Sequence, residues 1–167
     1  MPALHTCFSL LLSLCSIVPS PGLWAQIPDN SLQKKGENEL IAIHEEDRRA
    51  HFQHDISSLL SHIGAELIDV REGKVSKMSA SDVRKRFTDY FQHAEFSAWD
   101  DLDPPIVRVS ADGQLGWMIV RVRITYTETD QQGKKTLNDS VMAWMASYQK
   151  QSGRWIMTAV TSTSQAP

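Results

Sequence analysis

The chain has few cysteines and no excess of basic residues over acidic ones. Its only two cysteines, Cys7 and Cys15, lie in an apolar run near the N-terminus, so the rest of its 167 residues offers no thiol. A catalytic cysteine, a cysteine-ligated metal and a disulfide are therefore excluded beyond that run. The net charge is −3 with 17 Lys and Arg against 20 Asp and Glu, which argues against a nucleic-acid partner. No stretch reaches the ~20 apolar residues that a membrane span needs.

The apolar run itself, residues 7–18, is followed by two prolines and then by Ala25. An apolar core, a helix-breaking segment and a small residue at the cut are the order of a secretory signal peptide. We therefore expect residues 1–25 to be removed after Ala25, which makes the mature protein secreted or periplasmic. The alternative is a buried N-terminal helix, although the run lacks a polar stripe.

Periodicity predicts helices in the first half of the chain. Residues 26–36 are polar and are expected to form a tether, with a helix over residues 38–63 that breaks near Asp55. A strand is expected at 65–70, and a helix at 79–93 that begins with a capping box from Ser79 to Asp82. A further short strand is expected at 96–101.

The sequence pattern of the second half of the chain predicts an antiparallel meander. Three apolar-rich runs, 105–128, 136–150 and 154–164, are separated by turns too short for a parallel return. After Gly116 the alternation gives one apolar face, which needs helices to cover it. Which face of 136–150 joins that core stays open, because a shift of one residue reverses it. The expected fold class is α+β, a cone-shaped curved antiparallel sheet with the N-terminal helices on its concave face.

The order of these elements resembles the nuclear transport factor 2-like superfamily, and more narrowly its SnoaL-like branch, over residues 37–164. The residues that carry the resemblance are Asp55 after the first helix, Trp99-Asp-Asp101 before Pro104-Pro105, and Ala143-Trp144 followed by Gly153-Arg-Trp155. The resemblance implies a pocket enclosed by the curved sheet and the first helix, and dimers paired through the sheet. Members include steroid isomerases, epoxide hydrolases, cyclases and binding modules without catalysis, so the fold does not choose an activity.

Candidate chemistry lies on the first helix. His44, Asp47, His51 and Asp55 recur at helical spacing along one side. Asp47 and His51 could form a dyad in which the carboxylate orients the imidazole for proton transfer. The alternative is a solvated helix face with ordinary pairing between neighbouring turns. A metal site is not expected, because seven residues place His44 and His51 roughly 10 Å apart along the helix axis.

Aromatic side chains gather in or beside the predicted sheet. Core packing alone explains most of these aromatic side chains. The others could line an apolar cavity that contains a few polar groups. The expected lining residues of a pocket between the first helix and the sheet are His44, His51, Trp99, Tyr126 and Trp144.

Two functions of different classes follow from this pattern. The first is an exported domain that binds a small apolar molecule without catalysis and without a cofactor. The second is a pocket enzyme for acid–base isomerisation or hydrolysis that uses Asp47 and His51. The outer strand face with Trp117, Ile119, Arg121 and Arg123 has no helix left to cover it, so a homodimer through the sheet is also expected.

Overall fold

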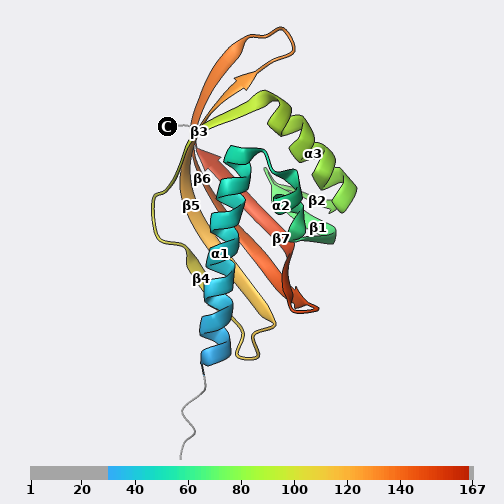
Figure 1. Cartoon of the computed structure of the whole chain (residues 1–167), viewed down its shortest axis with the longest axis vertical. Helices are drawn as coiled ribbons and strands as arrows, with labels where there is room; N and C mark the ends of the chain where they lie inside the picture. Colours follow the sequence, from blue (N-terminus) through green and yellow to red (C-terminus); the bar gives the residue numbers. More distant parts are fainter. Residues whose placement is uncertain (1–29, 166–167) are drawn as a thin grey trace, which may run out of the picture.

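The computed structural model describes residues 30–165, in which three helices lie against one curved sheet (Figure 1). No helix in this part of the chain is long and apolar enough to cross a membrane. The elements are α1 (Ser31–Gln53), α2 (Ile56–Ser61), β1 (Ile63–Arg71), β2 (Lys74–Ser79), α3 (Ala80–His93), β3 (Ala94–Asp101), β4 (Ile106–Val109), β5 (Leu115–Thr129), β6 (Lys135–Gln151) and β7 (Arg154–Gln165).

The first helix is longer than the sequence predicts. It begins at Ser31, so residues 31–36 are helical and the tether predicted for 26–36 is wrong over that part. The polar composition misled because these turns are held by tertiary packing, with Gly36 seated against Val109 and Trp155. The predicted break is confirmed: His54 adopts the left-handed conformation, and the carboxylate of Asp55 then caps α2 by accepting the Ser58 N–H at 3.1 Å.

The capped third helix is also confirmed, with the reciprocal bonds between Ser79 and Asp82 in place. The strand before it, β2, was not predicted. Its sequence is polar, and it pairs with β1 through a tight turn in which Glu72 and Gly73 both have positive φ, at 50° and 73°. Gly73 therefore lies in the turn that joins the two strands of this hairpin.

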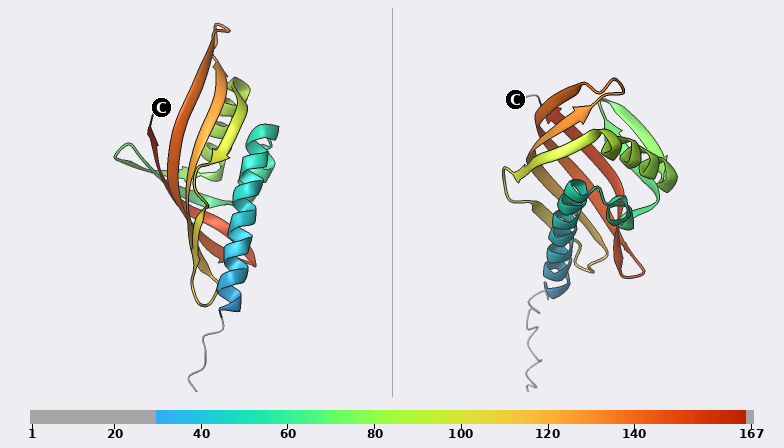
Figure 2. Two further views of the ribbon diagram at one scale, coloured as in Figure 1. Left: turned by 90° about the vertical axis from the view of Figure 1, so that its left-hand side faces the viewer. Right: turned by 45° about the horizontal axis from the view of Figure 1, so that its top comes forward.

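The seven strands form one sheet in the order β2–β1–β7–β6–β5–β3, with β4 also paired to β5. Every neighbouring pair is antiparallel except β1 with β7, which run parallel. The long β5–β6 hairpin projects past the rest of the sheet (Figure 1), and α1 lies against one side of the curved strands (Figure 2). The expected α+β cone with helices on its concave face is therefore confirmed.

Two details of the meander differ from the prediction or complete it. The run 105–128 is not one strand: β4 and β5 are separated by a turn at Gly113, which has a φ of 68°. The open register of β6 is resolved by pairing Val120 with Trp144 and Gly116 with Tyr148, so both aromatic side chains lie on the concave face.

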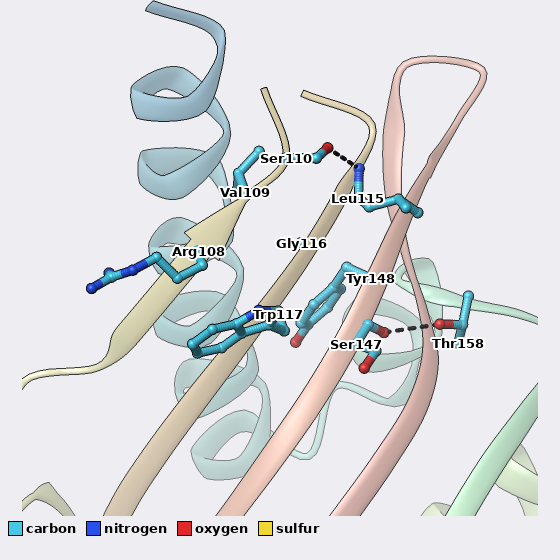
Figure 3. A pocket seen from close by; sticks show the side chains of 9 residues that line it. All are labelled: Arg108, Val109, Ser110, Leu115, Gly116, Trp117, Ser147, Tyr148 and Thr158. Carbon is cyan, nitrogen blue, oxygen red and sulfur yellow. Dashed lines mark hydrogen bonds between the residues drawn. The ribbon is translucent and has the colours of Figure 1, made fainter. Parts of the chain in front are cut away.

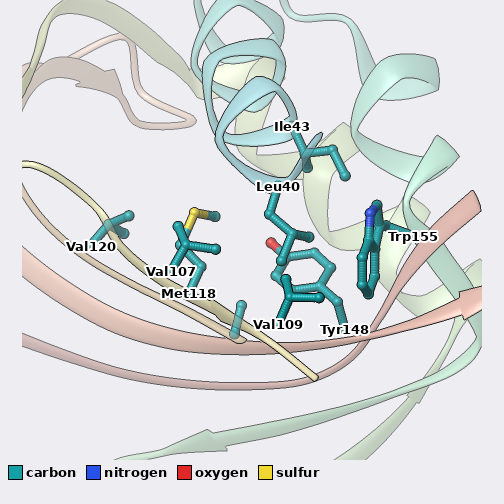
Figure 4. Packing of buried hydrophobic residues seen from close by; sticks show 9 residues of the cluster. Leu40, Ile43, Val107, Val109, Met118, Val120, Tyr148 and Trp155 are labelled. Carbon is teal, nitrogen blue, oxygen red and sulfur yellow. The ribbon is translucent and has the colours of Figure 1, made fainter. Parts of the chain in front are cut away.

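The core fills the space between α1 and the concave face (Figure 4). Close approach of the helix depends on Gly116, where an added Cβ would lie 2.8 Å from Cδ1 of Leu40 and 3.2 Å from the Arg108 carbonyl oxygen. Leu40 is fully buried, so its side chain has no space into which to move. The N-terminal half of α1 is thus packed directly onto the strands.

Gly116→Ala is therefore expected to lower the free energy of unfolding by about 1 kcal/mol, because the extra methyl group overpacks this contact. Leu115→Ala is the matched control, since Leu115 is the preceding residue, lies on the opposite face and is 55% exposed. We expect the control to change stability by less than about 0.5 kcal/mol in urea unfolding. Equal stability of both variants would show that α1 does not contact β5 at this point.

Candidate functional site

The sheet-facing side of α1 changes character along its length. Leu40 and Ile43 are buried in the apolar core, whereas Asp47 and His51 continue the same stripe one and two turns further on. Ionisable side chains thus stand where the pattern of the helix would otherwise supply apolar ones. Figure 4 shows the apolar end of this stripe pointing at the sheet.

The His51 ring lies among aromatic side chains from α3 and β3. Its centroid is 4.5 Å from that of Trp99, 5.4 Å from Phe96, 5.5 Å from Phe91 and 5.8 Å from Phe87. Burial in these apolar surroundings lowers the pKa of His51 to about 4, so the ring is neutral at pH 7. His51 is thus half-buried, with its ring among aromatic side chains.

The hydrogen bond between Asp47 and His51 does not involve the carboxylate. Nδ1–H of His51 donates to the backbone oxygen of Asp47 at 2.7 Å, which fixes the tautomer with the proton on Nδ1. The predicted carboxylate–imidazole dyad is thus not formed in this structure, because a ring four residues along the helix reaches the main-chain carbonyl first. Nε2 of His51 remains as an unprotonated acceptor.

The Asp47 carboxyl group is only partly exposed, and within residues 30–165 it has no hydrogen-bond partner. Removal of water and the nearby charge of Glu46 raise the pKa of Asp47 to about 7. A substantial fraction of the molecules therefore carries a protonated Asp47 at neutral pH, and the neutral acid is a hydrogen-bond donor.

Two further donors nearby lack partners. The hydroxyl of Tyr148 and Nε1 of Trp99 are both buried and make no hydrogen bond to any described residue. Burial raises the pKa of Tyr148, and the charge of Asp47 adds to the shift, so the phenol stays protonated. An unmet buried polar group costs free energy, so such groups in a native fold require an explanation.

His44 has a different role from the one expected of a pocket residue. It is almost fully buried, and Nε2–H donates to both carboxylate oxygens of Asp101, at 2.9 and 3.2 Å. This bond ties α1 to the end of β3. The ring also lies 6.2 Å from that of Trp144, which in turn lies 6.1 Å from Trp99.

The structure therefore brings four of the five predicted lining residues into one chain of ring contacts, from His44 through Trp144 and Trp99 to His51. Tyr126 is joined to them through Phe96, whose ring lies 5.6 Å from that of Tyr126 and 5.4 Å from that of His51. We use the name donor cluster for Asp47, Trp99 and Tyr148. The side chains of Trp99 and Tyr148 each have a hydrogen-bond donor without a partner, and Asp47 becomes a donor when its carboxyl group is protonated.

Sequence reasoning missed Tyr148 and Asp101 as members of the site. The sequence does not assign Tyr148 to the site, because the face of residues 136–150 that joins the core stays open from the sequence alone. Asp101 could not be assigned from the sequence, because its partner His44 lies 57 positions earlier in the chain. The alternation of Trp144, Ala146 and Tyr148 was the one available signal, since these residues share a face.

Other possible sites are limited. Among residues 30–165, no group of three or more His, Asp or Glu side chains is placed to hold a metal ion. Two surface depressions have volumes of about 450 Å³ and 320 Å³. The first lies mainly on the convex face of the sheet and includes Tyr148 of the donor cluster in its lining, and the second lies between α1, α2 and the β6–β7 turn. The donor cluster is connected to solvent through the partly exposed Asp47 and His51.

Comparison with known proteins identifies the fold. No family model matches the chain, and no curated protein matches it either. Solved structures do match: a ketosteroid isomerase-like protein from Erwinia carotovora atroseptica has a TM-score of 0.62 and 13% identity, covering 80% of this chain and 98% of that one.

Two other structures are similar to a comparable degree. A nuclear transport factor 2-like protein from Cytophaga hutchinsonii has a TM-score of 0.62 and 13% identity, covering 77% of this chain and 97% of that one. One from Rhodospirillum rubrum, described as of unknown function in nutrient uptake, has a TM-score of 0.58 and 16% identity, with coverage of 74% and 96%. The chain thus has the nuclear transport factor 2-like fold, and at these identities the likeness extends to the fold alone.

Proposed function

We propose that this protein is a small-ligand-binding domain of the SnoaL-like type, and that its ligand sits beneath α1 at the donor cluster. The observation that carries the proposal is the pair of buried, unpartnered donors, Tyr148 Oη and Trp99 Nε1. The charge of Asp47, whose pKa is about 7, acts on Tyr148, and the Trp99 ring contacts that of His51. Aromatic rings lie around Trp99 and the neighbouring His51. A mainly apolar site with a few convergent polar groups is the usual composition of a small-molecule site.

The chemistry of the cluster defines the ligand class. Protonated Asp47, Tyr148 and Trp99 all donate, so the ligand must present an acceptor oxygen such as that of a carbonyl group. The rings that flank His51 and Trp144 suit an apolar body of aromatic or alicyclic type. We infer an uncharged, largely apolar carbonyl compound.

One observation also favours catalysis as a second candidate function. A carboxyl group with a pKa near 7 is poised for general acid–base chemistry, since proton transfer is most efficient when the pKa is close to the working pH. Ionised Asp47 would take a proton from the carbon next to a bound carbonyl, while Tyr148 donates to the enolate oxygen. Return of the proton to carbon completes an isomerisation or an exchange.

The two functions can be separated with acetophenone, which has a carbonyl group, and ethylbenzene, which has the same shape without one. If the donor cluster binds a carbonyl, acetophenone shifts the indole N–H resonance of Trp99 in a saturable way and ethylbenzene does not. Tyr148→Phe should weaken acetophenone binding by about 10-fold, the usual worth of a lost hydrogen bond in a buried site. Equal effects of both compounds, or no effect of the variant, would rule the proposal out.

Catalysis is tested in the same samples. Exchange of the methyl protons of acetophenone with D₂O reports proton abstraction next to the carbonyl group. An enzyme would accelerate exchange by about 10²–10⁴-fold, and Asp47→Asn would abolish the acceleration. Binding without exchange supports the simple binding domain.

We also propose a homodimer formed through the convex face of the sheet (Figure 3). Strand register places Ile106, Trp117, Ile119 and Met145 together on this face, where Ile106 is 50% and Met145 36% exposed. The depression of about 450 Å³ beside Trp117 could accept a side chain from a second copy. A clustered exposed apolar surface of this kind marks an interface more often than idle surface.

Met145→Lys is expected to shift the dimer toward monomer, because a charge would be buried at the centre of the contact. Ile41→Lys is the matched control, since Ile41 on α1 is similarly exposed, at 38%, but lies on the other layer. Light scattering at tens of micromolar should show a dimer for wild type and for the control. A wild-type monomer under these conditions would contradict the dimer.

Export is proposed on the sequence of residues 1–25, which lie outside the described part of the structure. Cleavage after Ala25 would leave a mature chain that begins at Gln26 and contains no cysteine. Purification from a periplasmic or medium fraction followed by N-terminal sequencing tests this, and a chain that still begins at Met1 would refute it.

A further inference from the structure

A second depression, of about 320 Å³, lies between α1, the end of α2 and the turn from β6 to β7. It is separate from the donor cluster, which lies further along α1. Its lining combines three residues of α1, two at the end of α2 and three of the turn, namely Glu39, Ala42, Ile43, Ser61, His62, Gly153, Arg154 and Trp155. We call this depression the turn groove.

The floor of the turn groove is apolar and fixed. Ile43 and Trp155 are buried, at 6% and 4% exposure, and contribute one aliphatic and one aromatic surface. Ala42 is exposed at the side and takes up little space. The end of α2 is held to β7 by the backbone bond from Met157 N–H to the His62 oxygen at 2.7 Å, so the walls are preformed.

Both carboxylates next to the groove already have partners. Glu39 accepts from Lys150 at 2.7 Å and from Nε1–H of Trp155 at 2.8 Å, and these bonds lower the pKa of Glu39. Glu46 accepts from the Ser58 hydroxyl at 2.8 Å and from Nε2–H of His62 at 3.3 Å. Neither carboxylate therefore presents a strong unmet negative charge to a ligand.

The cationic groups are not balanced in the same way. The side chain of Arg154, exposed at the rim, makes no hydrogen bond or ion pair with any described residue. Lys35 lies 4.0 Å from Glu39, and Arg49 lies close enough to Glu46 to act on its charge. With Lys150 these side chains give a local excess of positive charge on a chain whose net charge is −3.

We propose that the turn groove binds a small organic monocarboxylate, with its apolar body against Ile43 and Trp155 and its carboxylate on the guanidinium of Arg154. A planar guanidinium can hold a carboxylate through two parallel hydrogen bonds, which fixes the orientation of the ligand. Shape and charge thus act together: the floor accepts an aliphatic or aromatic group, and the one unpaired charge at the rim selects an anion. This site is independent of the function proposed above.

Benzoate and benzyl alcohol are suitable probes, because they share the ring and differ in the charged group. Each is titrated into the full mature chain while the indole N–H resonance of Trp155, assigned with Trp155→Phe, is followed by NMR. Benzoate should give a saturable shift with a dissociation constant on the order of 1 mM, and benzyl alcohol should bind at least about 10-fold more weakly.

Three variants test the geometry. Arg154→Gln should weaken benzoate binding by about 10-fold, while Arg84→Gln, which makes the same charge change on the exposed face of α3, should leave it within about 2-fold. Ala42→Phe should abolish the shift by filling the groove from an exposed position. Each variant is first checked for an unchanged amide spectrum away from the substitution.

The proposal is overturned if benzoate gives no saturable shift, if benzyl alcohol binds as well as benzoate, or if Arg154→Gln and Arg84→Gln behave alike. Asp47→Asn serves to separate the two sites, because it alters the donor cluster and leaves the turn groove intact. Benzoate binding that is unchanged by Asp47→Asn but lost in Arg154→Gln supports the turn groove whatever the fate of the function proposed for the donor cluster.

Discussion

Asp47→Asn is expected to raise the free energy of unfolding by about 2–4 kcal/mol at pH 8 and to change it little near pH 4. In the fold the pKa of Asp47 is raised from 3.8 to about 7, so the folded state resists ionisation. As pH rises from 3.8 through 7, the unfolded chain loses a proton that the folded protein keeps, and stability falls. Asparagine has the shape of the neutral acid and removes this loss.

His51 has the opposite effect on stability. Its pKa is lowered from 6.5 to about 4, so between these values the unfolded chain binds a proton that the folded protein does not. The contribution of His51 is fully present above pH 6.5 and is lost as pH falls toward 4. His51→Phe, which keeps an aromatic ring, should therefore gain stability relative to wild type at pH 4–5, by about 2–3 kcal/mol.

The two slopes oppose one another between pH 4 and 6.5 in the wild type. Urea unfolding over this range should show that the free energy of unfolding of Asp47→Asn rises with pH relative to wild type, because the loss caused by Asp47 is removed. That of His51→Phe should fall with pH relative to wild type, because its gain is confined to low pH. Other titrating groups affect all three proteins alike and cancel in the differences. Parallel curves for wild type and both variants would mean that neither side chain is desolvated as the structure describes.

Tyr148→Phe is expected to stabilise the free protein by about 1–3 kcal/mol, since it removes a buried hydroxyl that has no partner among the described residues. The same change should weaken binding of a carbonyl ligand by about 10-fold, because it removes a donor. Gain of stability with loss of binding is the pattern of a group retained for a ligand rather than for folding.

Tyr126→Phe is the control for this substitution. Tyr126 lies on the neighbouring strand, where its hydroxyl interacts with that of Tyr90, so its removal should not stabilise the protein. Thermal unfolding distinguishes the two variants directly. If Tyr148→Phe lowers the free energy of unfolding as much as Tyr126→Phe does, the Tyr148 hydroxyl has a hydrogen-bond partner within the fold. The proposal of a ligand at the donor cluster would then lose its main support.

The parts of the fold that follow from local signals could be predicted from the sequence. The capping box at Ser79, the break before Asp55 and the short turn at Gly153 each act over a few residues, and each is confirmed. The apolar alternation after Gly116 likewise gave the concave face of β5 correctly. These features need no information about distant parts of the chain.

Features that depend on tertiary contacts could not be predicted. Residues 31–36 read as a tether because their helix is stabilised by packing of Gly36 on Val109, which is 73 positions away. Strand β2 is polar, and its place depends on pairing with β1. In the site, the Asp47–His51 pair was found, but its geometry depended on the aromatic rings that α3 and β3 place around it.

The most direct test of the donor cluster is the titration of Asp47 itself. The carboxyl carbon of Asp47, assigned with Asp47→Asn, is followed by ¹³C NMR across the acid and neutral range, with and without acetophenone. We predict a pKa near 7 in the free protein, raised further by the ligand because the protonated carboxyl group donates to the carbonyl oxygen. A pKa near the ordinary 3.8, or one that acetophenone leaves unchanged, would contradict a ligand site beneath α1.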